Sequence, residues 1–425
     1  MFKTFIDFFK NKDVRKRILV TLLILFIYRL GSAIPAPGIN STIIKLSANS
    51  ILGMMNILGG GSIEQMSIFS LGVGPYITAS IIIELLAMDI IPALAEMAKS
   101  GKKGRQQMDR INRYLGVAMG LVQGYFIVRL LANQYHMVDN PGFASYAYIA
   151  VIFTAGTMFL MWLADKITQY GIGNGTSMII FAGIVSNMPA NWKMVYNTFL
   201  GAEATSSLGV GGFIAYCVMY IAIIVLVVVM QLAERRIPIQ QSSSRALNKT
   251  KGDLNHIPLK INSASVVPVI FASALIQGPQ IIASWVNNDA YEWLQKICDF
   301  TSPWFLAFYA VLIILFTFFY TNLTIDPQKM ADDLGKNGQY IPGVRPGSET
   351  KNYVSKVLNR ITVLGAILLT FIALLPYVVS AVTGLPQTAA VGGTGIIIVI
   401  GVAMDTIKQM KSMLTSKQYK SFVGK

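Results

Sequence analysis

Long apolar stretches of about 20 residues recur along the whole chain and are separated by short polar or basic segments. Ten such stretches can be counted, near residues 18–36, 71–89, 114–132, 147–164, 172–189, 211–232, 264–284, 303–323, 361–381 and 391–408. Their apolar residues are continuous rather than alternating, which favours helices over the strands of a membrane barrel. Because about 20 helical residues cross the hydrocarbon core of a bilayer, the pattern predicts an all-α integral membrane protein with ten transmembrane helices.

The composition supports this prediction. Of the 425 residues, 54% are hydrophobic and only 13% are charged, whereas charged residues make up about a quarter of a soluble domain. The net charge of +15 needs no nucleic-acid partner, because the cytosolic segments of membrane proteins are rich in lysine and arginine. We therefore expect no specific nucleic-acid binding.

Basic residues also indicate the orientation. If ten helices cross the membrane in alternating directions, the two termini and every second connection lie on the same side of the membrane. Thirty of the 35 lysines and arginines fall in these segments. That side is predicted to be the cytosol. We therefore expect a multi-pass protein of the cytoplasmic membrane with both termini cytosolic.

One six-residue pattern appears twice, as Pro75-Tyr-Ile-Thr-Ala-Ser80 and as Pro268-Val-Ile-Phe-Ala-Ser273. Each copy lies in the second predicted helix of its half, where the halves are residues 1–190 and 191–425. Each half holds an odd number of helices, so the second half enters the membrane in the opposite sense and the repeat is inverted. Proline and small residues allow close, separable helix contacts, which suits a seam that opens.

A glycine-broken segment, Asn56–Phe69, lies between the first two predicted helices. It is apolar, contains three consecutive glycines and is too short to cross the membrane. We interpret it as a re-entrant half helix that implies a cavity on the external side. An ordinary surface helix in the external loop explains the same composition about as well.

Two predicted cytosolic loops, 234–260 and 326–360, are long for so compact a protein, and their size favours a cytosolic partner. The second loop contains Ile341–Gly347, where two Pro-Gly pairs hold a turn that presents Arg345 outward. A plain tethering loop with an incidental arginine is the alternative.

Seven ordered stretches carry a further signal: Ile34–Gly38, Leu71–Ile83, Gly171–Gly175, Arg236–Pro238, Ile341–Gly347, Gly392–Thr394 and Val402–Asp405. Together they resemble the SecY family, the channel subunits of the bacterial protein translocase, over essentially the whole chain. The resemblance implies a channel that passes unfolded secretory polypeptides across the membrane and releases transmembrane segments into lipid. It also implies a central hourglass pore between the two five-helix halves.

The resemblance assigns roles to particular residues. The plug corresponds to about residues 57–70 and includes Gly60, Gly61, Ile63 and Met66. The lateral gate lies between the second and third helices and the seventh and eighth, and includes Pro75, Ser80, Pro268 and Ser273. The pore ring consists of Ile77, Ile81, Ile180, Ile184, Ile270 and Ile398. A ring of branched aliphatic side chains dewets when it is empty and closes around a passing chain without binding it.

The implied partners are the SecA motor or the ribosome, which would meet Arg235, Arg236 and Arg345, together with SecE and SecG subunits and clients that carry signal sequences. Guanidinium groups suit the anionic surfaces of either cytosolic partner. Two features depart from the family pattern. The stretch Gln240–Arg245 is unusually rich in serine, and Glu84 stands where the family usually has an amide. We expect Glu84 to lie near the cytosolic mouth of the gate with its carboxylate extending toward the membrane interface, because a buried carboxylate is costly. A modest tuning role of Glu84 is the alternative.

Two other classes of function, a secondary transporter and an intramembrane enzyme, fit the sequence less well. An inverted-repeat secondary transporter of small solutes would need ionisable groups at the membrane midplane, and the predicted helices are nearly free of them. An intramembrane enzyme would need a nucleophile and a base at one depth, and the two histidines, His136 and His256, fall on opposite sides. We therefore expect neither catalysis nor a metal or other cofactor.

Overall fold

The computed structural model describes residues 11–39, 62–63, 65–87, 90–135, 138, 142–201, 209–241, 256–283, 302–383 and 387–423. Within these ranges, one helix coincides with each of the ten predicted stretches. They are α2 (Lys12–Ser32), α4 (Gly74–Leu86), α6 (Lys102–Tyr135), α7 (Phe143–Tyr170), α8 (Gly175–Leu200), α9 (Gly209–Leu232), α10 (Val267–Ala283), α12 (Pro303–Thr324), α14 (Ser348–Thr383) and α15 (Gln387–Val423). Two short helices, α5 (Pro92–Lys99) and α13 (Pro327–Lys336), lie in the connections.

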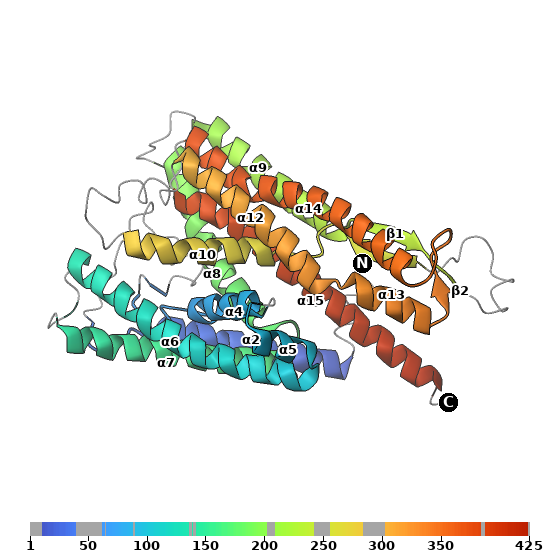
Figure 1. The fold of residues 1–425 in the computed structure, drawn as a ribbon. Coiled ribbons are helices and arrows are strands. Elements are labelled where there is room, and N and C mark those ends of the chain that lie inside the picture. The colour runs from blue at the N-terminus through green and yellow to red at the C-terminus, as the bar shows by residue number, and fades with distance from the viewer. Residues whose placement is uncertain are drawn as a thin grey trace.

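The helices form two groups (Figure 1). Helices α2, α4, α5, α6 and α7 lie together, and α9, α10, α12, α14 and α15 lie on the other side, with α8 between the two groups. Within the first group α6 packs on both α4 and α7, and within the second α12 packs on α10 and α14. The groups meet where α4 contacts α10 and where α15 contacts α8. The predicted boundary at residue 190 falls inside α8, because Pro189 does not end that helix.

The apolar surface of these helices is suited to lipid. In the part of the chain that the structure describes, five helices, α6, α7, α9, α12 and α14, contain segments long and apolar enough to cross a membrane. In α2, the side chains of Leu19, Leu22, Leu23 and Phe26 are each about 60% exposed. A row of large exposed apolar side chains would be unfavourable in water and is expected for a surface that faces lipid.

The two long loops fold together into one unit at the end of the molecule that is predicted to be cytosolic. Strand β1 (Glu234–Pro238) pairs with β3 (His256–Lys260) in antiparallel fashion. Strand β2 (Gln240–Gln241) pairs with β4 (Gln339–Tyr340), so the loops after α9 and α12 are joined by backbone hydrogen bonds. Beneath the strands lies a small core of Ile237, Ile239, Leu259, Leu334, Ile341, Val354 and Ile361.

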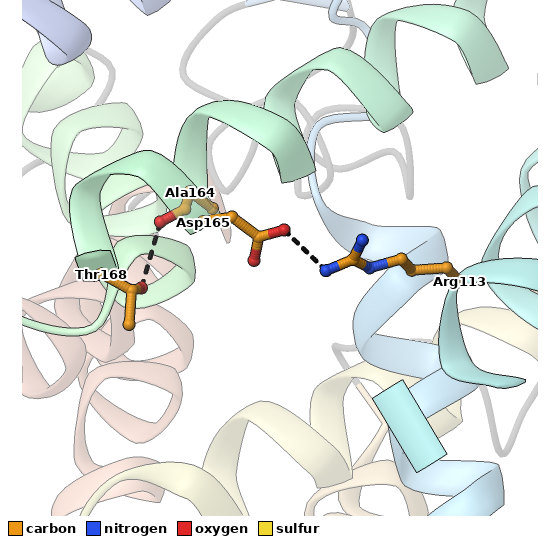
Figure 2. A network of polar contacts seen from close by, with 4 residues as sticks. All are labelled: Arg113, Ala164, Asp165 and Thr168. Atoms are coloured by element: carbon orange, nitrogen blue, oxygen red, sulfur yellow. Dashed lines mark hydrogen bonds and ion pairs between the residues drawn. The ribbon is translucent and has the colours of Figure 1, made fainter. Parts of the chain in front are cut away.

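At the same end, an ion pair links the neighbouring helices α6 and α7 (Figure 2). Arg113 Nη2 lies 2.8 Å from Asp165 Oδ2, and on α7 the Thr168 hydroxyl donates to the carbonyl oxygen of Ala164 over 3.0 Å. Both charged side chains are partly exposed. Such a pair contributes about 0–1 kcal/mol, so the packing of α6 on α7 depends mainly on their apolar contacts.

Candidate functional site

The segment that leads into α4 is a run of tight turns held by buried serines. Ser70 Oγ donates to the carbonyl oxygens of Ser62 (2.9 Å) and Ser67 (2.6 Å), and Ser67 N donates to the same Ser62 oxygen. Met66 has a φ of 45°, a left-handed conformation that is uncommon for a residue other than glycine. Of the stretch 56–69 that was expected to form a re-entrant half helix, residues 56–61, which include Gly60 and Gly61, and residue 64 lie outside the described residues. The described remainder consists of turns, with a bridge between Ser67 and Pro35, and is not helical.

Both predicted plug residues that the structure describes are buried: Ile63 is 1% exposed and Met66 is 2% exposed. They pack against α6 and α7 side chains in one apolar cluster. The carbonyl oxygen of Met66 also accepts from Ala36 N over 2.8 Å, which ties the segment to the chain after α2. The segment is thus anchored in the N-terminal group of helices.

Glycines on three helices make room for this segment. A Cβ atom at Gly31 of α2 would collide with the Phe69 ring, and one at Gly156 of α7 would collide with the carbonyl oxygen of Ile68. A Cβ at Gly124 of α6 would lie 3.3 Å from Leu71 Cδ1. We call the surface formed by Gly31, Gly124 and Gly156 the glycine cradle. The Phe69 ring is also stacked between Tyr28 and Phe159.

Two cavities lie on either side of a set of isoleucines. The outer cavity, of about 80 Å³, is bounded by Ile63 and by Ser70–Gly74 of the turn segment. The other cavity, of about 330 Å³, lies toward the end predicted to be cytosolic and is called the cytosolic cavity; its lining includes polar side chains such as Gln231, Asn262 and Gln409. Ile180, Ile270 and Ile398 line both cavities, so they separate one from the other.

The six isoleucines predicted for the pore ring divide into two sets. Ile77, Ile180, Ile270 and Ile398 line the outer cavity. Ile81 and Ile184, each 2% exposed, do not line either cavity and pack between helices instead. Ile184 lies against α15, where a Cβ atom at Gly395 would come within 2.9 Å of its Cγ2.

The four residues predicted for the gate lie on α4 and α10, which contact each other. Pro75 and Pro268 are buried, and Ser273 lines the outer cavity. The side chains of Ser80 and Ser273 make bonds within their own helices: Ser273 Oγ donates to the Ile270 carbonyl oxygen (2.8 Å) and Ser80 Oγ to Glu84 Oε1 (3.5 Å). The seam itself is apolar, since Ile77 and Ile270 pack against the core clusters of both halves.

The expected extension of the Glu84 carboxylate toward the interface is not seen at Oε2, which is buried with no hydrogen-bond partner among the described residues, although the residue as a whole is partly exposed. The cause is position, because Leu85 beside it and Ile81 one turn earlier pack into the cluster that includes α10 and α12 side chains.

The three predicted partner-binding arginines project from the cytosolic unit. Arg235 and Arg236 are exposed on β1, and Arg236 Nε lies 2.9 Å from Glu234 Oε1. Arg345 is exposed in a turn in which Val344 N donates to the Ile341 carbonyl oxygen. Gly343 (φ 81°) and Gly347 (φ 99°) on either side adopt conformations that favour glycine, which explains the two Pro-Gly pairs.

Sequence reasoning missed the buried serines and the polar side chains of the cytosolic cavity. Ser62, Ser67 and Ser70 are each at most 3% exposed, and their grouping within nine residues beside a glycine run was the available signal. Gln409 Oε1 accepts from Gly173 N over 2.6 Å and so joins α15 to the Gly171–Gly175 stretch. A contact over such a separation along the chain gives no signal in a single sequence.

Comparisons with known proteins agree with this architecture. The SecY family model matches residues 67–407. The chain is 42% identical to the protein translocase subunit SecY of Bacillus licheniformis and 41% identical to that of Staphylococcus aureus, in each case over all of both chains.

Solved structures resemble the fold at lower identity. A structure described as that of a protein conducting channel has a TM-score of 0.65 at 19% identity, and the similarity covers 94% of this chain and 92% of the other. Sec61 in the canine ribosome-channel complex has a TM-score of 0.64 at 19% identity, with the same coverage. From its sequence relatives and its fold, the chain belongs to the SecY family of protein translocase subunits.

Proposed function

We propose that the two cavities are the external and cytosolic parts of one path for unfolded polypeptide, closed between them by Ile77, Ile180, Ile270 and Ile398. The observation that carries the proposal is that three of these side chains line both cavities. Branched aliphatic side chains exclude water from an empty constriction and offer no hydrogen bonds that would hold a passing chain. Ile81 and Ile184 lie behind this ring and support it through helix packing.

The seam between α4 and α10 is the proposed lateral gate. It has apolar contacts and no hydrogen bond between Ser80 and Ser273, since each hydroxyl bonds within its own helix. Apolar contacts can be exchanged for contacts with an entering apolar segment or with lipid at little cost, because all of these surfaces are similar. Pro75 lies at the start of α4 beside the outer cavity, whereas Pro268 lies at the start of α10, which begins beside the cytosolic cavity, so the two helices run in opposite senses along the seam.

The turn segment containing Ile63 and Met66 is the proposed plug base. It closes the outer cavity from the external side, and its anchoring in the glycine cradle supports a stable closed state. In one of the structurally similar proteins, the plug domain is described as stabilising the closed state of the translocation channel and maintaining a membrane seal.

The cytosolic unit is the proposed docking surface for a motor or a ribosome. Arg235, Arg236 and Arg345 project from elements that β2 and β4 join, so they can act as one basic surface toward an anionic partner. Two similar structures, canine Sec61 and yeast Ssh1, are described as complexes with ribosomes. SecA as the motor, SecE and SecG as associated subunits, and cytosolic termini complete the proposal.

A secondary transporter is disfavoured by the described lining of the outer cavity, where the side chains are mainly apolar and, among the described residues, none is ionisable except that of Tyr28. Coordination of an ion or solute at the midplane needs polar or charged groups. We infer that translocation uses energy from the cytosolic partner and that this subunit performs no catalysis.

Site-specific photocross-linking to a stalled, half-exported client tests the path. A photoreactive residue at position 77, 180, 270 or 398 is expected to capture the client. The same residue at position 22, which is 58% exposed on the proposed lipid face of α2, serves as the control. Capture at position 22 with none at the four ring positions would overturn the proposed path.

A further inference from the structure

Glu84 is an acidic side chain on the proposed gate helix α4, close to its C-terminal end. Oε1 has a long hydrogen bond to Ser80 Oγ at 3.5 Å, and Oε2 is buried with no partner among the described residues. A buried polar oxygen without a partner costs about 1–3 kcal/mol, and more when it is charged. The closed gate therefore leaves one strong acceptor site unused.

The surroundings place Glu84 at the cytosolic part of the seam. It lies within electrostatic range of Tyr320 on α12, and Tyr320 lines the cytosolic cavity. The Tyr320 ring packs edge-on against Phe271 of α10 at a centroid distance of 6.0 Å. Tyr320 thus belongs to the wall of the gate opposite α4, and opening of the gate moves this wall away from Glu84.

Among the described residues, no cation pairs with this free oxygen. Tyr76, on the same helix, is within electrostatic range of Asp109, Asp165 and Arg113 as well as of Glu84. Among these groups Arg113 is the cation, and its guanidinium is paired with Asp165 at 2.8 Å. An entering cation would be the natural partner for Glu84.

A transmembrane segment that enters the gate brings such a cation with it. Segments that keep one end in the cytosol carry lysine or arginine at that end, and a long basic side chain can extend several ångströms from an apolar helix. We propose that Glu84 is a specificity-determining residue of the gate, which pairs with a basic residue at the cytosolic flank of a client segment while the segment passes between α4 and the opposite wall formed by α10 and α12. This inference rests on the proposed lateral gate.

The test uses the full-length chain with its associated subunits in membrane vesicles. Client segments of one hydrophobicity carry Lys, Gln or Glu at the cytosolic flank, and the fraction released into lipid is measured by protease protection. Each client is tested with three forms of the chain: the unchanged chain, the Glu84→Gln variant and the Glu84→Lys variant. The matched control is Glu96→Gln, which removes an exposed carboxylate from the adjacent helix α5.

With the unchanged chain, the Lys-flanked client should be released about fivefold more efficiently than the Gln-flanked one, a ratio that corresponds to a partly hydrated ion pair. Glu84→Gln should abolish this ratio, Glu84→Lys should invert the preference toward the Glu-flanked client, and Glu96→Gln should leave it unchanged. Equal effects of Glu84→Gln on all three clients would show a purely structural role and overturn the proposal.

A second measurement separates failure of this inference from failure of the gate itself. A cysteine at position 84 and one at the client flank are tested for disulfide formation during release, with a cysteine at position 273 and one at the client midpoint as the gate control. Bonding at 273 without bonding at 84 would refute the role of Glu84 and keep the gate. Bonding at neither position would refute both.

Discussion

Replacement of Ile270 with asparagine tests whether the isoleucines close the channel. Ile270 lines both cavities and packs against the apolar clusters of both halves, and it is partly rather than fully buried. At the low end of the usual ranges, loss of its apolar burial costs about 1.5 kcal/mol and a poorly satisfied amide about 1 kcal/mol. If only the closed state makes these contacts, the open fraction rises roughly 70-fold, since each 1.4 kcal/mol is a factor of ten.

The assay is the leak of potassium ions from liposomes that contain the full-length chain with its associated subunits and no client. Ile270→Asn should leak strongly, and it should also accept clients with defective signal sequences. Ile270→Leu, which keeps volume and polarity, should remain tight. Ile276→Asn places the same amide on α10 at a residue that is 5% exposed and lines neither cavity. An equal leak from Ile276→Asn, or a tight Ile270→Asn channel, would refute the constriction.

Three further changes probe other parts of the site. Gly156→Ala should displace the plug base and raise the leak of the closed channel, because its Cβ would collide with the Ile68 carbonyl oxygen. Gly211→Ala on α9, where a Cβ meets no atom within 4 Å, should leave the leak unchanged. Equal leaks from the two variants would exclude a role for the glycine cradle. Ile77 and Ser273 both line the outer cavity, so cysteines introduced at these positions, with Cys217 and Cys298 changed to serine, should be bridged by a short bismaleimide. The bridge should block release of clients into lipid. Release at the normal rate after bridging would argue against a gate at α4 and α10. Arg345→Glu should reduce motor-driven export at least tenfold, the loss expected when an interfacial charge pair becomes a repulsion. The variant protein should still be found in the membrane. Export at the normal rate in vesicles would count against the docking surface.

Much of the helical architecture could be predicted from hydrophobicity alone. Each predicted apolar stretch coincides with a helix because a backbone in lipid must satisfy its own hydrogen bonds. Helix ends were less certain: α6, α14 and α15 extend well beyond their apolar stretches into basic segments. Likewise the predicted stretch 172–189 ends at Pro189, although α8 continues through this proline to Leu200.

The site itself could be predicted only in part. The family resemblance pointed to isoleucines on α4, α8, α10 and α15, but helical periodicity does not distinguish the face that lines a cavity from the face that packs on a neighbour. Ile77 and Ile81 lie one turn apart, and the structure places only Ile77 at a cavity. The burial of Glu84 depends on α10 and α12, which are more than 180 residues away along the chain, so its local sequence could not reveal it.

The glycine cradle has a consequence for how the channel opens. All three of its glycines belong to α2, α6 and α7 in the N-terminal group, and the turn segment is tied to the same group through Ala36 N and the Met66 carbonyl oxygen. Across the outer cavity, the opposite wall includes Ile270, Ser273 and Ala274 of α10. When α10 separates from α4, the plug base is therefore expected to stay with the N-terminal group. Opening of the gate would widen the outer cavity without pulling out the plug base.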